Sequence, residues 1–174
     1  MADPRLIGRA ALACGALATA LAVDFVTKWL ILNVVMAPAR TIEIAPFFNL
    51  TLGFNTGVSF GMFRDLFVEQ PLLLAGITVV IAAGFLVWAV CTARRIETFA
   101  LGLIAGSAVG NVVDRVRHGA VTDFLDFYVG DWHWPAFNMA DTMITIGVVL
   151  LIAGSFWRPR SMAAAQKQPI RAGH

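Results

Sequence analysis

The sequence is poor in charged residues, and this shortage excludes whole classes of protein. Only 14% of its 174 residues are charged, whereas a soluble domain usually has about 25%. The formal net charge of +2 is too small to argue for nucleic-acid binding. With a hydrophobic content of 59%, the composition indicates an integral membrane protein, and the length fits one domain.

Cysteine and histidine are also scarce, and neither has the spacing of a metal or nucleophile site. Cys14 and Cys91 lie in apolar runs with no histidine or second cysteine at ligand spacing, so we interpret them as small apolar filler. The three histidines, His118, His133 and His174, are scattered. The sequence therefore predicts neither a zinc or haem centre nor a Ser-His or Cys-His nucleophile system.

Four apolar runs are long enough to cross the roughly 30 Å hydrocarbon core of a bilayer. We expect membrane spans at about residues 10–32, 71–91, 98–114 and 138–157. The first run contains Ala18-Thr-Ala20, a small-residue pattern found at signal-peptide cleavage sites. Because the run continues past this pattern and carries Asp24 and Lys28, we interpret it as a span.

The long segments between these spans have the pattern of short strands and turns. Thr41–Ile44 alternates polar and apolar residues, and Phe48–Phe54 is rich in aromatic and β-branched ones. Ala120–Tyr128 also looks extended, with a turn at Gly130-Asp131 after it. Runs of this kind, separated by glycine and proline, predict a small sheet outside the membrane.

Lysine and arginine set the expected orientation. They are more numerous in the N-terminal segment, the 92–97 turn and the segment after residue 157 than in the two long segments, 33–70 and 115–137. The positive-inside rule then places both termini in the cytoplasm and the two long segments on the outer side. Residues 158–174 have no apolar period, and we expect a disordered cytoplasmic tail.

Polar residues on three different spans fall at a common depth. Counted at about 1.5 Å per residue from the basic inner end of its own span, each lies roughly 22–25 Å across the membrane. These residues are Asp24, Asn111 and Asp141. Because an ionisable group beside lipid costs a few kcal/mol or more, an aligned set indicates a shared site near the outer face.

Several of these residues also have a purely structural interpretation. Asp24 and Lys28 lie four apart on one helix and can form an ion pair without any part in a site. Asn111 and Asn138 can serve as hydrogen bonds that hold helices together in lipid. Asp141 is harder to explain in this way, and it shares a helix face with Asn138, three residues earlier.

The remaining aspartates are less informative from the pattern alone. Asp114 fits an ordinary interfacial pair with Arg115, and Asp131 fits a turn. Asp123 and Asp126 lie three apart on a predicted strand, so they point to opposite faces and only one of them is expected to enter a site. The alternation does not say which.

Five short motifs follow one another along the chain. They are Asp24-Phe-Val-Thr-Lys28, Asn55-Thr-Gly57-Val-Ser-Phe-Gly61, Gly110-Asn111-Val-Val-Asp114-Arg115, Val121-Thr-Asp123-Phe-Leu-Asp126-Phe and Phe137-Asn138-Met-Ala-Asp141. In this order and spacing they resemble the lipoprotein signal peptidases, the type II signal peptidases of bacteria. The match extends through all four predicted spans, and a set of five is specific where any one motif is weak.

The resemblance implies an intramembrane aspartyl endopeptidase that cuts a prolipoprotein just before a cysteine carrying diacylglycerol. Matched by motif, Asp123 and Asp141 are implied as the catalytic pair, in preference to Asp126. The positions implied to line the site or support the pair are Asn55, Gly57, Asn111, Arg115, Asn138, Asp24 and Lys28. No cofactor and no metal is implied.

The implied fold is an all-α membrane protein: a four-helix transmembrane bundle with a small extracytoplasmic β-sheet and a half-helix on the outer membrane face. Residues 1–157 would form a single peptidase domain in the bacterial inner membrane, with an amphipathic turn near Arg64–Glu69. The implied partners are diacylglyceryl-modified prolipoproteins and membrane lipid, and nothing requires more than a monomer.

Two other functions fit parts of the pattern. Intramembrane carboxylates also serve proton-coupled transporters, but here the polar residues gather at one rim and the inner halves of the spans are almost uncharged. A non-enzymatic membrane adaptor would use the outer segments as a docking surface. Neither accounts for the set of five motifs.

Overall fold

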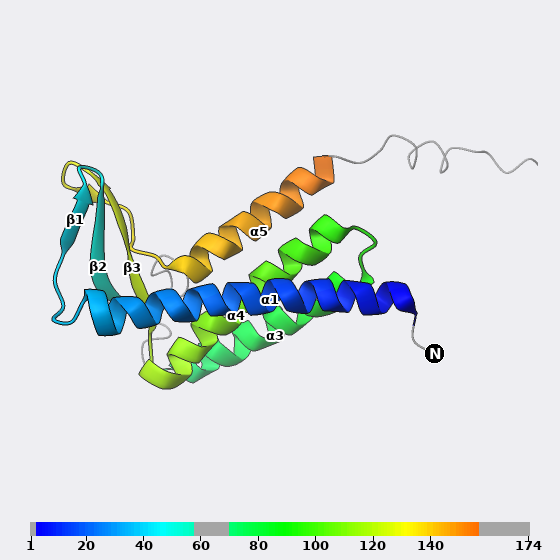
Figure 1. The fold of residues 1–174 in the computed structure, drawn as a ribbon. Helices are drawn as coiled ribbons and strands as arrows, with labels where there is room; N and C mark the ends of the chain where they lie inside the picture. Colours follow the sequence, from blue (N-terminus) through cyan, green and yellow to red (C-terminus); the bar gives the residue numbers. More distant parts are fainter. Residues whose placement is uncertain (1–2, 58–69, 157–174) are drawn as a thin grey trace, which may run out of the picture.

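The computed structural model describes residues 3–57 and 70–156. Within these residues, four long helices run side by side, and a small antiparallel sheet lies at one end of them, away from the N-terminus (Figure 1). The helices are α1 (Pro4–Leu30, continued by the π-helix η1, Ile31–Val35), α3 (Pro71–Cys91), α4 (Arg95–His118) and α5 (Met139–Phe156). All four are long and apolar enough to cross a membrane, so the predicted fold class is confirmed.

The helices α1 and α4 extend beyond the apolar runs that predicted them, because helical hydrogen bonding does not stop where the apolar residues do. The start of α1 is fixed by Asp3, whose Oδ1 accepts from the Arg5 amide at 2.9 Å, and by Pro4 in the first turn. The end of α4 is fixed by Gly119, which has φ 73° and donates to the Arg115 carbonyl. Helix α4 therefore carries Arg115 within its last turn.

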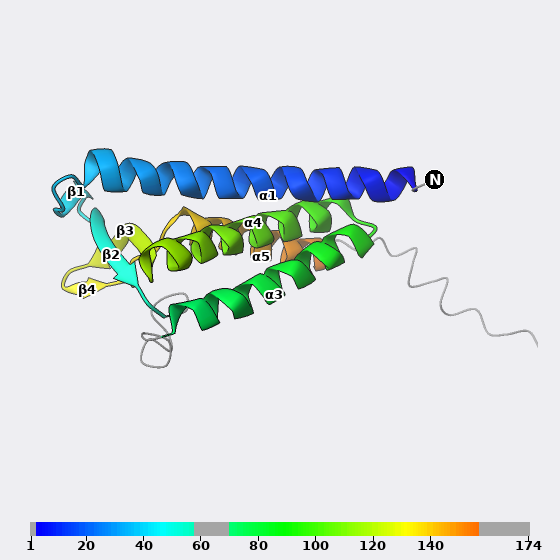
Figure 2. The ribbon, with the colours of Figure 1, turned by 90° about the horizontal axis from the view of Figure 1, so that it is seen from below.

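Helix α4 lies at the centre of the bundle, with α1, α3 and α5 packed around it (Figure 2). Its most apolar stretch is 67% buried, against 17–22% for the other three helices. The three outer helices therefore present most of their apolar side chains to the surrounding lipid. A polar group within this buried stretch of α4 is enclosed by protein, which is where an intramembrane polar group is tolerated.

Small residues bring the helices close to α4. A Cβ at Gly102 would lie 2.6 Å from the Ala13 carbonyl oxygen, and one at Gly106 would overlap the backbone of Leu17 on α1. A Cβ at Gly147 of α5 would lie 2.9 Å from the Ala100 carbonyl oxygen of α4. Gly102 and Gly106 therefore lie in the contact surface between α1 and α4, where small residues let two helix backbones approach closely.

Gly106→Ala is expected to destabilise the bundle by about 1–3 kcal/mol, because the new methyl group meets backbone that cannot turn away. Gly84→Ala in α3 is the matched control, since a Cβ there meets nothing within 4 Å. The control is expected to be neutral or slightly stabilising, as alanine favours helix. Thermal unfolding followed by tryptophan fluorescence measures both, and equal melting temperatures would contradict this packing.

The sheet contains four antiparallel strands in the order β1-β2-β3-β4. They are β1 (Ile42–Ala45), β2 (Phe48–Asn55), β3 (Val121–Val129) and β4 (Trp132–His133). The three predicted extended segments correspond to β1, β2 and β3, and a turn at Gly130-Asp131 joins β3 to β4. Phe124 of β3 packs against Ile31 and Met36, which fixes the sheet on the end of the bundle.

Three predictions concern residues outside this description. The amphipathic turn near Arg64–Glu69, the half-helix expected in the same segment and the tail at 158–174 lie outside the described residues. They stay predictions.

Candidate active site

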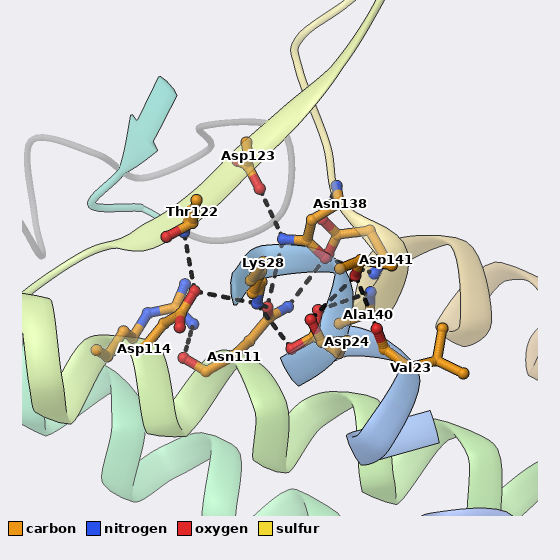
Figure 3. A network of polar contacts seen from close by, with 12 residues as sticks. Val23, Asp24, Lys28, Asn111, Asp114, Thr122, Asp123, Asn138, Ala140 and Asp141 are labelled. Atoms are coloured by element: carbon orange, nitrogen blue, oxygen red, sulfur yellow. Dashed lines mark hydrogen bonds and ion pairs between the residues drawn. The ribbon is translucent and has the colours of Figure 1, made fainter. Parts of the chain in front are cut away.

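Polar side chains from three helices and one strand meet where the bundle joins the sheet (Figure 3). Each comes from a motif singled out in the sequence, and several are almost fully buried. They are Asp24 and Lys28 of α1, Asn111 and Asp114 of α4, Asp123 of β3, and Asn138 and Asp141 at the start of α5. Asp24, Asn111 and Asp141, which the sequence predicts to lie at one depth in the membrane, therefore also lie close together in the structure.

Asn138 and Asp141 close the first turn of α5 by a reciprocal pair of hydrogen bonds. The Asp141 amide donates to Asn138 Oδ1 at 3.0 Å, and the Asn138 amide donates to Asp141 Oδ2 at 3.2 Å. This is a capping box, which satisfies two amides that have no partner within the helix. The Asp141 carboxylate is thereby held at the positive end of a helix dipole, where a negative charge is stabilised.

Asn138 also connects this turn to the sheet. Its Nδ2 donates to Asp123 Oδ1 at 2.7 Å, and the Asn138 side chain is fully buried. Figure 3 shows the contacts that run from Asp123 through Asn138 to Asp141. Asn138 thus contacts two carboxyl groups that are far apart in the sequence, Asp123 through its side-chain amide and Asp141 through its backbone amide.

The pKa of Asp123 is raised from its usual 3.8 to about 7. Burial is the main cause, and the negative charge of Asp141 is the second. Hydrogen bonds from Asn138 and Asn55 and the charge of Lys28 act in the opposite direction. Near neutral pH, the Asp123 carboxyl group therefore holds a proton far more readily than an ordinary aspartate.

The ammonium group of Lys28 contacts two carboxylates and the Asn111 side chain. It lies 2.8 Å from Asp24 Oδ2, 3.0 Å from Asp114 Oδ2 and 3.0 Å from Asn111 Oδ1. Because Asn111 Oδ1 accepts from Lys28, its Nδ2 faces Asp141 and donates to Oδ1 at 3.3 Å. The predicted Asp24–Lys28 ion pair is present. It is not an isolated pair, because Lys28 also contacts Asp114 and Asn111.

Asp24 and Asp114 tie the network to the backbone around it. Asp24 Oδ1 accepts from the Ala140 amide in the first turn of α5 at 3.2 Å. A Cβ at Gly110 would collide with the Asp24 carboxylate, so this contact requires glycine there. Asp114 Oδ2 accepts from the Thr122 amide at 3.0 Å, which joins α4 to β3 next to Asp123.

The ordinary interfacial pair expected between Asp114 and Arg115 is wrong. Asp114 is buried and has Lys28 as its cation. Arg115 points elsewhere: its Nη2 donates to the Gly57 carbonyl and its Nη1 to the Asn111 carbonyl. Neighbours on a helix differ by about 100° in direction, which separates the two side chains.

The guanidinium of Arg115 lies at the edge of the carboxyl pair. It is buried, and its charge acts on Asp141, Asp123 and Asp114. Among the residues that the structure describes, its Nε has no hydrogen-bond partner. Gly57, which accepts from Arg115, is itself held by Asn55, whose Oδ1 accepts from the Gly57 amide at 2.9 Å. A buried cation with an unused donor is suited to bind a carbonyl or an oxyanion.

A cavity of about 140 Å³ adjoins these groups. Its polar lining includes Asn111, Arg115 and Asp141, and Leu74, Ala108 and Ile144 are among its apolar residues. It has room for a water molecule with several polar partners. Its apolar side comes from α3, α4, α5 and Val121 of β3, so the cavity lies where the bundle helices meet the sheet.

Asp126 takes no part in this network. It accepts from Asn49 Nδ2 at 3.3 Å and contacts His133 Nδ1 at 2.9 Å, so it joins neighbouring strands of the sheet. This agrees with the expectation that only one of Asp123 and Asp126 enters the site. Within residues 3–57 and 70–156, no group of three or more His, Cys, Asp or Glu side chains is placed to hold a metal ion.

A family model described as signal peptidase II matches residues 16–157 of the chain. The chain belongs to the signal peptidase II family. The resemblance seen in the five motifs is thereby confirmed, and the match includes every site residue described above. This family member is therefore a multi-pass membrane peptidase.

Individual relatives agree with the family assignment. The lipoprotein signal peptidase of Cupriavidus taiwanensis is 50% identical over 119 residues, which is 67% of each chain. That of Hydrogenovibrio crunogenus is 38% identical over 140 residues, covering 79% of this chain and 81% of the relative. A bacterial membrane enzyme solved by the in meso method at 2.3 Å is 26% identical with a TM-score of 0.71, covering 92% and 94% of the two chains.

The sequence missed one residue of the site in this signal peptidase II family member. The pattern predicts an interfacial Asp114, whereas the residue lies three positions after Asn111 and so faces the same side of α4. That spacing was the available signal. Its cation could not be inferred, because Lys28 lies on another helix.

Proposed function

We propose that this peptidase removes the signal peptide of prolipoproteins by hydrolysing the bond just before a diacylglyceryl-modified cysteine. Asp123 and Asp141 are the catalytic residues of the proposal. Its principal support is the bridge that Asn138 makes between the two carboxyl groups at the end of the bundle. The relatives are named lipoprotein signal peptidases, which supports the substrate class.

In the proposed reaction Asp123 starts protonated and Asp141 starts ionised. The raised pKa of Asp123 supports its role as acid. The amides and the helix dipole around Asp141 support its role as base. Two nearby carboxyl groups cannot both ionise cheaply, so the pair holds one proton between them.

Hydrolysis then follows general acid–base chemistry. The Asp141 carboxylate takes a proton from a water molecule, and the water oxygen attacks the scissile carbonyl carbon. Asp123 donates its proton to the carbonyl oxygen, giving a tetrahedral diol. When the diol collapses, the C–N bond breaks, the amine takes the proton from Asp141, and Asp123 regains its own.

The other site residues orient these groups. Asn111 and Asn138 fix the carboxyl orientations by the bonds described above. Arg115 contacts the substrate backbone or the developing oxyanion, consistent with its buried charge and unpartnered Nε. The cavity beside Asp141 has room for the attacking water.

The position of the pair explains how a lipidated substrate is handled. In the proposed orientation both termini are cytoplasmic and the pair lies near the outer face of the inner membrane. The acyl chains of the substrate stay in lipid between helices while the cysteine reaches the interface. Exposed aromatic side chains on the sheet and in the segments next to its strands, Phe47, Phe54, Trp132 and Trp134, suit that interfacial depth.

The rate of cleavage is expected to fall as the pH rises above about 7. Asp123 must carry a proton to act as acid, and its pKa is raised to about 7, so the proton is present below this pH and lost above it. On the alkaline side kcat/KM should fall by about tenfold per pH unit. A flat profile between about pH 6 and 9 would contradict this assignment of the acid.

Asn138→Ser tests the same assignment through the pKa. Serine retains an oxygen that caps α5, but it is too short to donate to Asp123 as Asn138 Nδ2 does. Because that bond lowers the pKa of Asp123, its loss is expected to move the alkaline limb of kcat/KM to higher pH. If the variant is active and the alkaline limb of its kcat/KM profile is unchanged, the assignment of Asp123 as the acid is contradicted.

The function itself is tested by incubating the purified chain in detergent with a diacylglyceryl-modified precursor and with the same precursor unmodified. Mass spectrometry of the products is expected to show a new N-terminus at the modified cysteine and no cleavage of the unmodified precursor. Cleavage at another bond, or equal cleavage of both precursors, would contradict the proposal.

A further inference from the structure

We propose that the end of the bundle opposite the aspartate pair contains a binding site for one anionic phospholipid. The site is a groove of about 1030 Å³ between the first turns of α1 and the start of α4. Its lining includes three arginines, Arg5, Arg9 and Arg95, together with Leu12, Ile96 and Phe99. We call these six residues the inner groove.

The three arginines line one groove, and the residues that the structure describes supply no anion to balance them. In the described part of the chain, none of them has an acidic side chain within ion-pair distance. Their neighbour Arg94 differs, because it pairs with Glu97 at 3.0 Å and also donates to the Gly154 carbonyl. The unbalanced positive charge predicts an anionic ligand, and arginine suits the oxygens of a phosphate group.

The apolar part of the groove decides between a free phosphate and a phospholipid. Ile96 is 41% exposed and Phe99 is 36% exposed, and both lie on the same first turns of α4 as Arg95. A soluble phosphate would leave this apolar surface in water. A phospholipid places its phosphate among the arginines and its acyl chains along Leu12, Ile96 and Phe99.

The location of the groove fits a lipid headgroup. Both ribbon views show the N-terminus of α1 and the turn between α3 and α4 at the end away from the sheet (Figures 1 and 2). At about 1.5 Å per residue, Arg9 lies roughly 22 Å along α1 from Asp24. The groove therefore lies at the headgroup level of the leaflet opposite the aspartate pair, whichever way the bundle is oriented.

Native mass spectrometry of the full chain in mild detergent tests this site. The protein is titrated with phosphatidylglycerol and with phosphatidylcholine of the same acyl chains. Wild type is expected to retain one phosphatidylglycerol in preference to phosphatidylcholine. Arg9→Gln combined with Arg95→Gln is expected to weaken phosphatidylglycerol binding about 25-fold, or roughly fivefold for each arginine.

Arg40→Gln combined with Arg117→Gln is the matched control. It removes the same charge from the other end of the molecule and is expected to leave phosphatidylglycerol retention unchanged. Thermal unfolding of both variants confirms that they are folded. A third arm adds glycerol 3-phosphate, which carries the headgroup charge without acyl chains and is expected not to compete.

Three results would overturn the proposal. Equal retention of the two lipids by wild type would remove the charge selectivity. Equal losses in the two double variants would show a general surface charge effect and no site. If glycerol 3-phosphate competed at the same concentration as the lipid, the groove would be a phosphate site to which Leu12, Ile96 and Phe99 contribute nothing.

Discussion

Asp141→Asn is expected to abolish cleavage of a lipidated precursor, and Asp123→Asn is expected to do the same. An amide in place of Asp141 cannot take the proton of the attacking water, and one in place of Asp123 cannot release a proton to the carbonyl oxygen. The loss of general acid–base catalysis predicts a fall in kcat of about 10²–10⁴. Product formation measured by mass spectrometry at saturating substrate gives the value for each variant.

Asp126→Asn is the control for these substitutions. It makes the same chemical change on the same strand as Asp123. The Asp126 carboxylate, however, contacts Asn49 and His133 of the sheet and lies outside the network around Asp123. This variant is expected to cleave at close to the wild-type rate. If either Asp123→Asn or Asp141→Asn matched it, the pair would not be catalytic.

Lys28→Met is expected to have the largest effect on stability, a loss of about 3–5 kcal/mol in the free energy of unfolding. The ammonium group is the shared cation of two buried carboxylates, at 2.8 Å from Asp24 and 3.0 Å from Asp114. Without it, both negative charges remain buried and uncompensated. Unfolding in a titration with a denaturing detergent, followed by tryptophan fluorescence, measures the change.

Neutralising the Asp24 and Asp114 carboxylates as well should restore much of this stability. The triple variant Lys28→Met, Asp24→Asn, Asp114→Asn replaces an ionic cluster by neutral groups of similar size, which is often close to neutral in energy. Arg40→Met, at an exposed position, controls for the loss of one positive charge. If Lys28→Met were no worse than Arg40→Met, the cluster would not hold the helices together.

The bundle could be predicted from the sequence because lipid imposes a simple requirement on the chain. Only a helix satisfies its own backbone groups across a bilayer, so long apolar runs locate the helices. The helix found at Pro71–Cys91 has the bounds of the run that predicted it. The strands β1 and β2 were recognisable for a different reason, the aromatic and β-branched residues bounded by turn residues.

The sequence predicts how deep in the membrane the site residues lie, but not which side chains contact one another. A fixed rise per residue places Asp24, Asn111 and Asp141 at one level without knowledge of the packing. Lateral positions depend on which helix faces overlap, so the contact between Lys28 and Asp114 required the structure. The same holds for Asp123 and Asp126, because strand alternation separates their faces without saying which face meets α5.

Asn138 shows what a motif leaves out. Its spacing from Asp141 predicted a shared helix face, and the structure adds a capping box in which each residue binds the amide of the other. The same asparagine is the contact between α5 and Asp123. Its position in the motif is therefore explained by helix capping and by carboxyl pairing together.

Infrared difference spectroscopy tests most directly whether the two aspartates share one proton. At about pH 6, one unit below the raised pKa of Asp123, the wild type minus Asp123→Asn spectrum is expected to contain one protonated-carboxyl band, which titrates away near pH 7. In Asp141→Asn the band should persist but titrate away at a lower pH, because the negative charge of Asp141 helps to raise the pKa of Asp123. The presence of the band in Asp123→Asn, or its titration in Asp141→Asn at the wild-type pH or above, would contradict the assignment of the proton to Asp123.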